Sequence, residues 1–149
     1  MNVSLRNIDD ENREECIRLS VRDDQKEYIA ANTKSLADAA DNADVARTFG
    51  IYAGSRMVGF AMFAFDENNE DPEDKYWLWR FMIDKDEQGK GYGKAALTGI
   101  IRYFREHGAD IITLSTKPSN TTALGLYHQA GFCENGLMNG DEIILKLRL

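Results

Sequence analysis

Residues 76–97, YWLWRFMIDKDEQGKGYGKAAL, decide how the rest of this chain is interpreted. The first eight are aromatic or apolar apart from Arg80, which is typical of a buried β-strand. A polar turn, the glycine-rich segment 88–93 and apolar residues at helical spacing through Phe104 follow. Closely spaced glycines let a ligand approach the backbone, and the first N–H groups of a helix carry partial positive charge. The order strand, glycine-rich loop, helix therefore predicts a phosphate-binding site.

The glycine spacing separates three kinds of phosphate-binding loop. A dinucleotide fingerprint, G-x-G-x-x-G, would need its third glycine at Lys94 or Ala96. A Walker loop would need a glycine at Gln88 and a serine or threonine at Ala95. The pattern that fits is Q-x-x-G-x-G at 88–93. A turn without a ligand is the weaker interpretation, because three close glycines destabilise the start of a helix without structural need.

The segment 88–93, with its preceding strand and following helix, resembles the pyrophosphate-binding motif of the GNAT superfamily of acyl-CoA-dependent N-acetyltransferases. A second segment, Asn120-x-x-Ala123-x-x-x-Tyr127, resembles the N-x-x-A-x-x-x-Y segment of that superfamily. Taken alone, this second segment fits an ordinary capped helix with a core tyrosine equally well. The two motifs in this order extend the resemblance over 76–132, and the flanking strands suit the same fold.

The resemblance implies an α+β (mixed α/β) fold with a central mixed, mostly antiparallel sheet of about six to seven strands. The sheet is expected to contain a splayed parallel pair and to carry helices on both faces. The resemblance also implies that a bulge at 81–83 exposes backbone groups to the acyl and pantetheine chains. The residues expected to bind acetyl-CoA are Phe81, Met82, Ile83, Gln88, Gly89, Lys90, Gly91, Tyr92, Gly93, Lys94 and Asn120.

The hydrophobic pattern predicts the elements around this unit. Strands are predicted at 3–8, 47–53, 56–65, 76–83, 110–116 and 141–149. Helices are predicted at 11–19, 36–43, 94–105 and 120–130, with Thr33 or Ser35 as N-cap of the second. A hairpin at Gly54, a solvated loop at 66–74 and a turn at 136–140 are also predicted. The strands at 76–83 and 110–116, joined by a helix, are expected to be parallel.

Composition points to one domain, residues 1–149, with a sizeable hydrophobic core. The net charge of −7 disfavours nucleic acid and anionic membranes as partners and favours a cationic one. No membrane-spanning run or signal peptide is found, so we expect a cytoplasmic protein in which Cys16 and Cys133 are reduced thiols. His107 and His128 lack the spacing of metal ligands, so no metal is expected.

The predicted activity is transfer of the acetyl group of acetyl-CoA to a primary amine. By resemblance Tyr127 is the catalytic general acid, and a phenol can supply the proton that the departing thiolate needs. The general base stays open, because Trp79 stands where some polyamine acetyltransferases carry a glutamate. A non-catalytic acyl-CoA-binding module is the alternative from a different class.

The acceptor is predicted to be a polyamine such as spermidine or spermine. The segment 23–38 resembles the corresponding part of bacterial spermine/spermidine acetyltransferases, and carboxylates beside an aromatic wall suit a flexible polycation. The residues predicted to bind the acceptor are Glu27, Tyr28 and Trp79. An aminoglycoside or a protein or peptide amine is the alternative acceptor. A homodimer is a possible assembly that the sequence leaves open.

Overall fold

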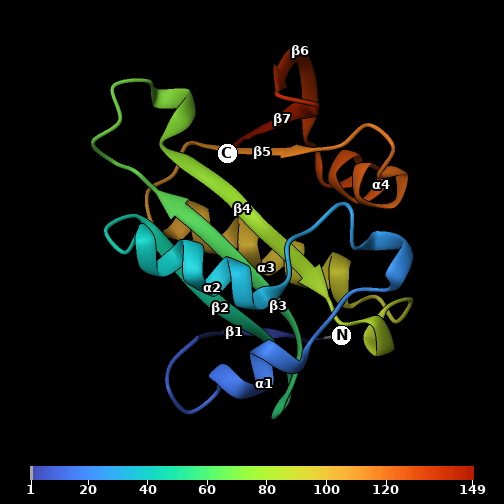
Figure 1. Cartoon of the computed structure of the whole chain (residues 1–149). Helices are drawn as coiled ribbons and strands as arrows, with labels where there is room; N and C mark the ends of the chain where they lie inside the picture. The colour runs from blue at the N-terminus through green and yellow to red at the C-terminus, as the bar shows by residue number, and fades with distance from the viewer. Residues whose placement is uncertain (1) are drawn as a thin grey trace.

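The computed structural model describes residues 2–149, which form a seven-stranded sheet between two layers of helices (Figure 1). The strand order is β1-β2-β3-β4-β5-β7-β6, and neighbours are antiparallel except for the parallel pair β4 and β5. The predicted fold class is confirmed. The strands are β1 (Ser4–Asn7), β2 (Ala46–Ala53), β3 (Arg56–Phe65), β4 (Tyr76–Ile83), β5 (Ile111–Thr116), β6 (Cys133–Asn139) and β7 (Glu142–Arg148).

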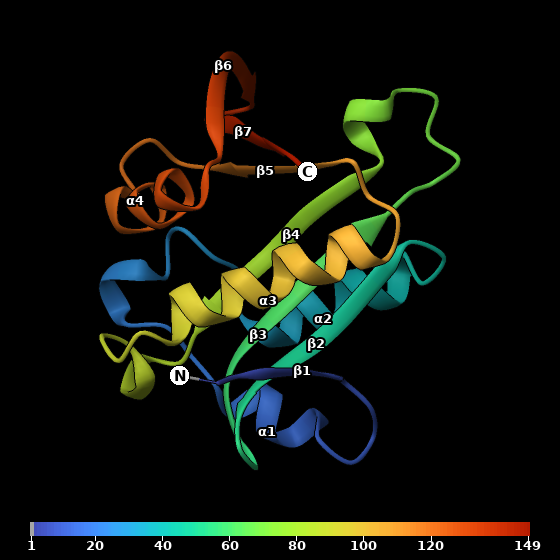
Figure 2. The ribbon, with the colours of Figure 1, turned by 180° about the vertical axis from the view of Figure 1, so that it is seen from behind.

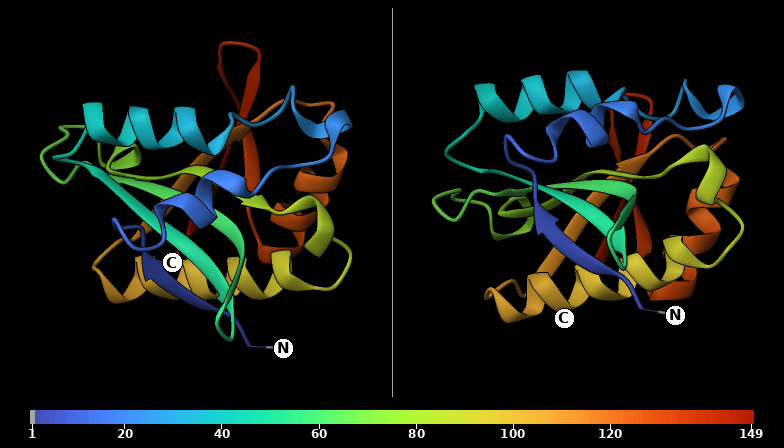
Figure 3. Two further views of the ribbon diagram at one scale, coloured as in Figure 1. Left: turned by 60° about the horizontal axis from the view of Figure 1, so that its bottom comes forward. Right: turned by 90° about the horizontal axis from the view of Figure 1, so that it is seen from below.

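The helices cover both faces of this sheet. Figures 1 and 2 show α1 and α2 on one face and α3 on the other, and Figure 3 shows the resulting three layers. Helix α4 packs against the same core as α3. The helices are α1 (Arg13–Arg18), α2 (Asn32–Asp41), α3 (Tyr92–Glu106) and α4 (Thr121–Ala130), and short 3₁₀ turns occupy Asp23–Gln25, Pro72–Asp74 and Lys85–Glu87.

Each face of the sheet has its own hydrophobic core. The α3 side contains Phe63 and Phe104, which are fully buried with ring centroids 4.7 Å apart. The α1 and α2 side contains Cys16, Phe60 and Met82. Burying one such side chain contributes about 1.5–3 kcal/mol, so these cores hold β3 and β4 rigidly in the middle of the sheet. Strand β4, which borders the candidate site, is thereby fixed on both faces.

Several local predictions are confirmed, and two are wrong. The β2–β3 hairpin turns at Gly54, whose φ of +62° suits glycine. Thr33 and Ser35 do not cap α2, because both lie inside the helix and Ala31 is at its N-cap. The segment 136–140 is not a turn alone, because β6 runs through it to Asn139. Strand β6 is exposed throughout and is held by backbone pairing with β7, so it lacks the buried alternation that reveals a strand.

The loop at 66–74 is mostly exposed, as predicted, but Glu73 is half-buried and contacts the sheet. The Glu73 carboxylate pairs with Arg148 at 3.0 Å and with Lys146 at 3.2 Å, and the Thr113 hydroxyl donates to the Glu73 carbonyl oxygen at 2.8 Å. These contacts fasten the loop to β5 and β7. Glu73 therefore holds this end of the loop beside the sheet.

The bulge in β4 lies earlier than the resemblance implies. Met62 pairs with Arg80 and Phe63 pairs with Leu78, which leaves Trp79 as the extra residue. In a bulge two successive side chains turn toward the same face. Trp79 accordingly packs with the core under α1 and α2, and Arg80 reaches Asp38 on α2. The bulge expected at 81–83 thus lies at Trp79 instead.

Candidate active site

Strands β4 and β5 separate after a single paired position, Trp77 opposite Thr113. The opening between them leads into a cavity of about 1380 Å³. Ligand sites usually measure about 300–1,000 Å³, so this cavity has room for two substrates. Figure 1 shows the two strands diverging, with α4 beside the opening. The cavity is lined by the segment between α1 and α2, by β4 and β5, by the start of α3, by α4 and by the β6–β7 turn.

The glycine-rich loop forms one end of the cavity. Gly89 and Gly91 have φ values of +76° and +89°, and Gly91 is the N-cap of α3. The first intrahelical bond found there joins the Ala95 N–H to the Gly91 oxygen, so the three preceding N–H groups, those of residues 92–94, have no acceptor within the helix. A Cβ on Gly93 would meet Leu126 and Ile83 only at 3.7 and 3.9 Å, so the absence of a side chain leaves open space above these donors.

This arrangement fits the pyrophosphate of acetyl-CoA, because free N–H groups at a helix start and an uncovered backbone suit an anion. Of the predicted loop residues, Gln88, Gly89, Tyr92 and Gly93 line the cavity. Lys90, Gly91 and Lys94 are exposed and lie outside its lining. Lys90 instead contacts Glu87, with 3.3 Å between the ammonium nitrogen and a carboxylate oxygen.

Gln88 holds the loop in place. Its Nε2 donates to the Ile83 carbonyl oxygen at 2.9 Å and to Gln25 Oε1 at 2.9 Å. In return, Gln25 Nε2 donates to Gln88 Oε1 at 3.1 Å. The side chain of Gln88 thus connects the end of β4, the glycine loop and the segment between α1 and α2.

The free edge of β4 contributes backbone groups. Phe81, Met82 and Ile83 all line the cavity. The Asp84 N–H donates to the Val58 oxygen of β3 at 2.8 Å, and the hydrogen-bonding direction alternates along an antiparallel strand. Met82 therefore bonds toward β3, whereas the N–H and C=O of Phe81 point toward the opening. The Ile83 oxygen, on the same side, already accepts from Gln88.

Tyr127 reaches the cavity from α4 and is only 8% exposed. Helix α4 is terminated by Gly131, with a φ of +105°. The Phe132 N–H donates to the backbone carbonyl oxygen of Tyr127 at 3.0 Å. The rings of Tyr127 and Phe132 lie edge to face, 5.7 Å apart. Burial raises the pKa of the Tyr127 phenol well above its ordinary value, so the hydroxyl stays protonated at neutral pH.

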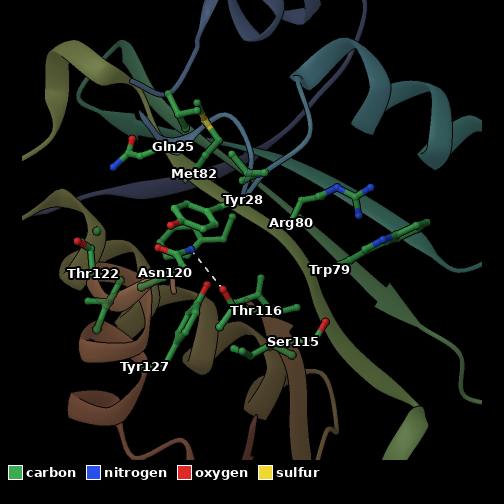
Figure 4. A pocket seen from close by; sticks show the side chains of 18 of the residues that line it. Gln25, Tyr28, Trp79, Arg80, Met82, Ser115, Thr116, Asn120, Thr122 and Tyr127 are labelled. Atoms are coloured by element: carbon green, nitrogen blue, oxygen red, sulfur yellow. Dashed lines mark hydrogen bonds between the residues drawn. The ribbon is translucent and has the colours of Figure 1, made fainter. Parts of the chain in front are cut away.

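Asn120 and Thr116 stand next to Tyr127. Figure 4 shows Tyr127, Thr116 and Asn120 in one part of the pocket, with a hydrogen bond of 3.3 Å from Asn120 Nδ2 to Thr116 Oγ1. Asn120 lines the cavity and is the N-cap residue of α4, although its side chain makes no capping bond. Its role in binding acetyl-CoA stays a prediction.

The predicted acceptor residues separate in space. Tyr28 and Trp79 line the cavity, and the Tyr28 hydroxyl donates to the Ser119 oxygen at 3.3 Å. Glu27 is exposed and lies outside the lining. Asp23 contacts Lys26 at 2.8 Å, so it too belongs to the solvated surface of this segment.

Four polar residues outside the predicted site also line the cavity. Asp66 and Asp74 come from the β3–β4 loop, and Ser115 and Glu142 come from β5 and β7. The Ser115 hydroxyl donates to Glu142 Oε1 at 2.6 Å. The alternation of β7 indicated a strand, but the sequence held no signal for its pairing with β5.

Arg80 also lines the cavity, and an acid pairs with its charge. Its guanidinium contacts Asp38 at 3.0 Å, and Lys34 contacts the same carboxylate at 3.1 Å. Burial lowers the pKa of Arg80, and the nearby carboxylates of Asp38 and Glu142 oppose this shift. Asp38 is thus the acid that pairs with Arg80 inside this strand.

Comparison with known proteins identifies the family. Residues 5–132 match the acetyltransferase (GNAT) family. The chain belongs to the GNAT family. Two Bacillus subtilis proteins are similar to this GNAT chain over 98% of its length and 99% of theirs. They are a probable spermine N(1)-acetyltransferase of subspecies natto, 35% identical, and the spermine/spermidine N(1)-acetyltransferase of strain 168, 34% identical.

A solved GNAT structure shows the same fold. The spermidine N-acetyltransferase of Vibrio cholerae, in complex with CoA and spermine, superposes with a TM-score of 0.74 at 19% identity. That comparison covers 98% of this chain and 95% of the other. Family membership confirms the predicted enzyme class, an acetyl-CoA-dependent N-acetyltransferase, and its cosubstrate.

Two further findings describe residues 2–149. They contain no cluster of three or more histidine, cysteine, aspartate or glutamate side chains arranged to hold a metal ion. Within the same residues, no helix has both the length and the apolar character needed to cross a membrane.

Proposed function

We propose that this GNAT enzyme acetylates a primary amine of a polyamine such as spermidine or spermine, with Tyr127 as general acid. One observation carries the proposal. The cavity continues from Tyr127 and the free edge of β4 to an end lined by two tryptophans, Trp77 and Trp79, and two carboxylates, Asp66 and Asp74. The names of the two Bacillus subtilis relatives, similar along the whole chain, support the same acceptor.

The acceptor end suits a long, flexible polycation. Carboxylates attract ammonium groups, and the face of a tryptophan ring attracts a cation by about 0.5–2 kcal/mol. From Phe81 back to Tyr76 the strand spans five residues, or about 16 Å at about 3.3 Å per residue. A polyamine could place one amine near Phe81 and a second charge near Asp66 or Asp74. The net charge of −7 would also raise the encounter rate.

The proposed mechanism is direct attack of the amine on the thioester. The N–H of Phe81, which points into the opening, would donate to the acyl oxygen as negative charge develops there. Tyr127 would give its proton to the sulfur as the carbon–sulfur bond breaks. The free N–H groups at the start of α3 would hold the pyrophosphate and so fix the position of the thioester.

The raised pKa of Tyr127 keeps the phenol in the form that can donate. A buried phenolate is also a strong base, so it would recover a proton at once from the newly formed, protonated amide nitrogen. Tyr127 thereby returns to its starting state in each turnover.

A thiol-release assay on the purified chain tests this function. We expect CoA release with spermidine, and a Michaelis constant for spermidine that rises as salt increases from about 50 to 300 mM, because screening shortens the reach of the carboxylates. The Michaelis constant for a monoamine of similar length, which carries a single positive charge, should change less and serves as control. CoA release with aminoglycosides or peptide amines, but with no polyamine, would overturn the acceptor assignment.

A further inference from the structure

The general base of the reaction is not supplied by β4, where Trp79 occupies the bulge. An ammonium group must lose a proton before it can attack a thioester, so some group in the cavity has to accept that proton. The carboxylates that line or adjoin the cavity are the candidates, and most of them are already committed. Asp38 pairs with Arg80, Glu87 pairs with Arg56 at 3.0 Å, and Asp141 pairs with Lys117 at 3.8 Å.

Two further acids lie too far along the cavity. Asp66 and Asp74 flank the start of β4, about 16 Å from Phe81 by the rise of a strand. Distance therefore excludes them from the proton transfer at the reacting nitrogen. Glu142 differs from all of these, because it is hydrogen-bonded at 2.6 Å to a hydroxyl, that of Ser115, which itself lines the cavity.

The sheet register places Ser115 nearer to the reacting groups at Phe81 than Asp66 or Asp74. Thr113 pairs with Trp77 in the parallel pair, so Ser115, two residues on, stands across the opening at the level of Trp79. Ile112 and Leu114 face the core under α3, so strand alternation turns Ser115 toward the opposite face, where Trp79 packs. Figure 4 shows Ser115 pointing toward the side of Trp79 and Arg80, away from Tyr127.

We infer that Ser115 and Glu142 form the proton relay that deprotonates the acceptor amine. This rests on the proposed direct attack and adds its missing base. The ammonium gives one proton to the Ser115 oxygen while the Ser115 hydroxyl proton passes to Glu142 Oε1. The freed lone pair forms the carbon–nitrogen bond, the carbon–sulfur electrons leave with sulfur, and Tyr127 protonates that sulfur. Glu142 then releases its proton to solvent, which is the net proton of the reaction.

The two sides of the opening thus contribute different proton transfers. Tyr127 arrives with α4 from the α3 side, protonates the thiolate and recovers a proton from the amide nitrogen, whereas Ser115 takes the first proton from the acceptor ammonium. Ser115 is the catalytic residue here, and Glu142 is a positioning residue that acts through it. The charged groups around Glu142 are Arg80 of β4 with Asp38 of α2, the pair Lys117 and Asp141 at 3.8 Å, and the pair Lys146 and Glu73 farther along β7.

The pH dependence of Glu142→Gln tests the relay. Glutamine keeps the oxygen that accepts from Ser115 but cannot take up a proton at that oxygen, so kcat should fall about a hundredfold at pH 7. From pH 7 to 9 the free-amine fraction in solvent rises about tenfold per unit, so the variant should recover most of this loss, whereas the parent should change less. The control is Glu134→Gln on β6, which removes the same charge outside the cavity and should keep the parent profile.

Two other variants keep the inference falsifiable. Ser115→Ala should reproduce the loss, and the double variant should be no worse than the more damaging single one, because the two residues act as one unit. A Glu142→Gln loss that stays constant with pH, or that raises only the Michaelis constant of the amine, would overturn the relay. The measurement uses whichever amine the parent acetylates fastest, so a failure of the polyamine assignment is seen separately in the parent.

Discussion

The side-chain amides of Gln25 and Gln88 hydrogen-bond to each other in both directions, at 3.1 and 2.9 Å. Gln25 belongs to the segment between α1 and α2, which covers the cavity. Gln88 begins the glycine-rich loop. This reciprocal pair therefore couples the cover of the cavity to the loop proposed to hold pyrophosphate. It also explains a glutamine at the head of the motif, since its side chain positions the loop.

Gln25→Ala should raise the Michaelis constant for acetyl-CoA about three- to tenfold, because the loss of this pair removes about 0.5–1.5 kcal/mol of positioning. Steady-state kinetics with acetyl-CoA as the varied substrate measures the change. Asn69→Ala, in the β3–β4 loop, removes a side-chain hydrogen bond elsewhere and should leave that constant unchanged. An unaltered constant in Gln25→Ala would show that the pair does not support the loop.

Gly93→Val should weaken CoA binding at least tenfold, because a branched side chain would occupy the open space above the free N–H groups of α3. Gly93 is a cleaner probe than Gly91, whose φ of +89° would strain any replacement with or without a ligand. Calorimetric titration with CoA measures the affinity. Gly99→Val lies in the same helix with nothing near its added Cβ and serves as the matched control. A folded Gly93→Val variant with the CoA affinity of the parent would refute pyrophosphate binding at the start of α3.

Tyr127→Phe should keep CoA affinity and lose about a hundredfold or more in kcat, because only the phenolic proton is removed. Single-turnover measurements isolate the chemical step. Tyr103→Phe provides the control, since the Tyr103 hydroxyl contacts Arg47 at 2.9 Å and lies outside the cavity lining. Unchanged chemistry in Tyr127→Phe would mean that another group protonates the thiolate.

Stability should fall at high pH through Cys16. The thiol is fully buried, and burial raises its pKa from 9.0 to about 11. The unfolded thiol ionises near pH 9 and the folded one near pH 11, so the free energy of unfolding should drop by about 2 kcal/mol across that window. Cys16→Ala should remove this drop between pH 9 and 10, below the range in which buried tyrosines contribute.

Urea unfolding at fixed pH steps measures the drop. Cys133→Ala changes an exposed thiol and should leave the pH dependence of the parent intact. A parent that is equally stable at pH 8.5 and 10 would contradict the prediction.

The local parts of the site were predictable from sequence, and the paired parts were not. Glycine spacing predicts the loop around Gly91, and a terminating glycine predicts the end of the helix that carries Tyr127. Both are short-range signals. The contact between Ser115 and Glu142 depends on the register of β5 against β7, which no local pattern encodes. The same holds for the contact between Arg80 and Asp38, which depends on the bulge at Trp79 and on where α2 packs against the sheet.

Glu27 is a residue that was predicted to belong to the site but lies outside it. An acid in the right segment was expected to face the acceptor, but the 3₁₀ turn at Asp23–Gln25 and the chain after it leave Glu27 exposed, outside the cavity lining. The carboxylates that line the proposed acceptor end come instead from the loop at 66–74. That loop is acidic enough to suggest solvation, and the long-range contacts of Glu73 fasten it to the sheet.

A one-pot competition tests the polyamine assignment most directly. The purified enzyme is given limiting acetyl-CoA with equal concentrations of spermidine, an aminoglycoside and a peptide with a free amino terminus, and the acetylated products are quantified by mass spectrometry. The product ratio equals the ratio of kcat/KM values for the competing amines. The account predicts that monoacetylated spermidine predominates and matches the CoA released. An acetylated aminoglycoside or peptide beside unmodified spermidine would contradict it.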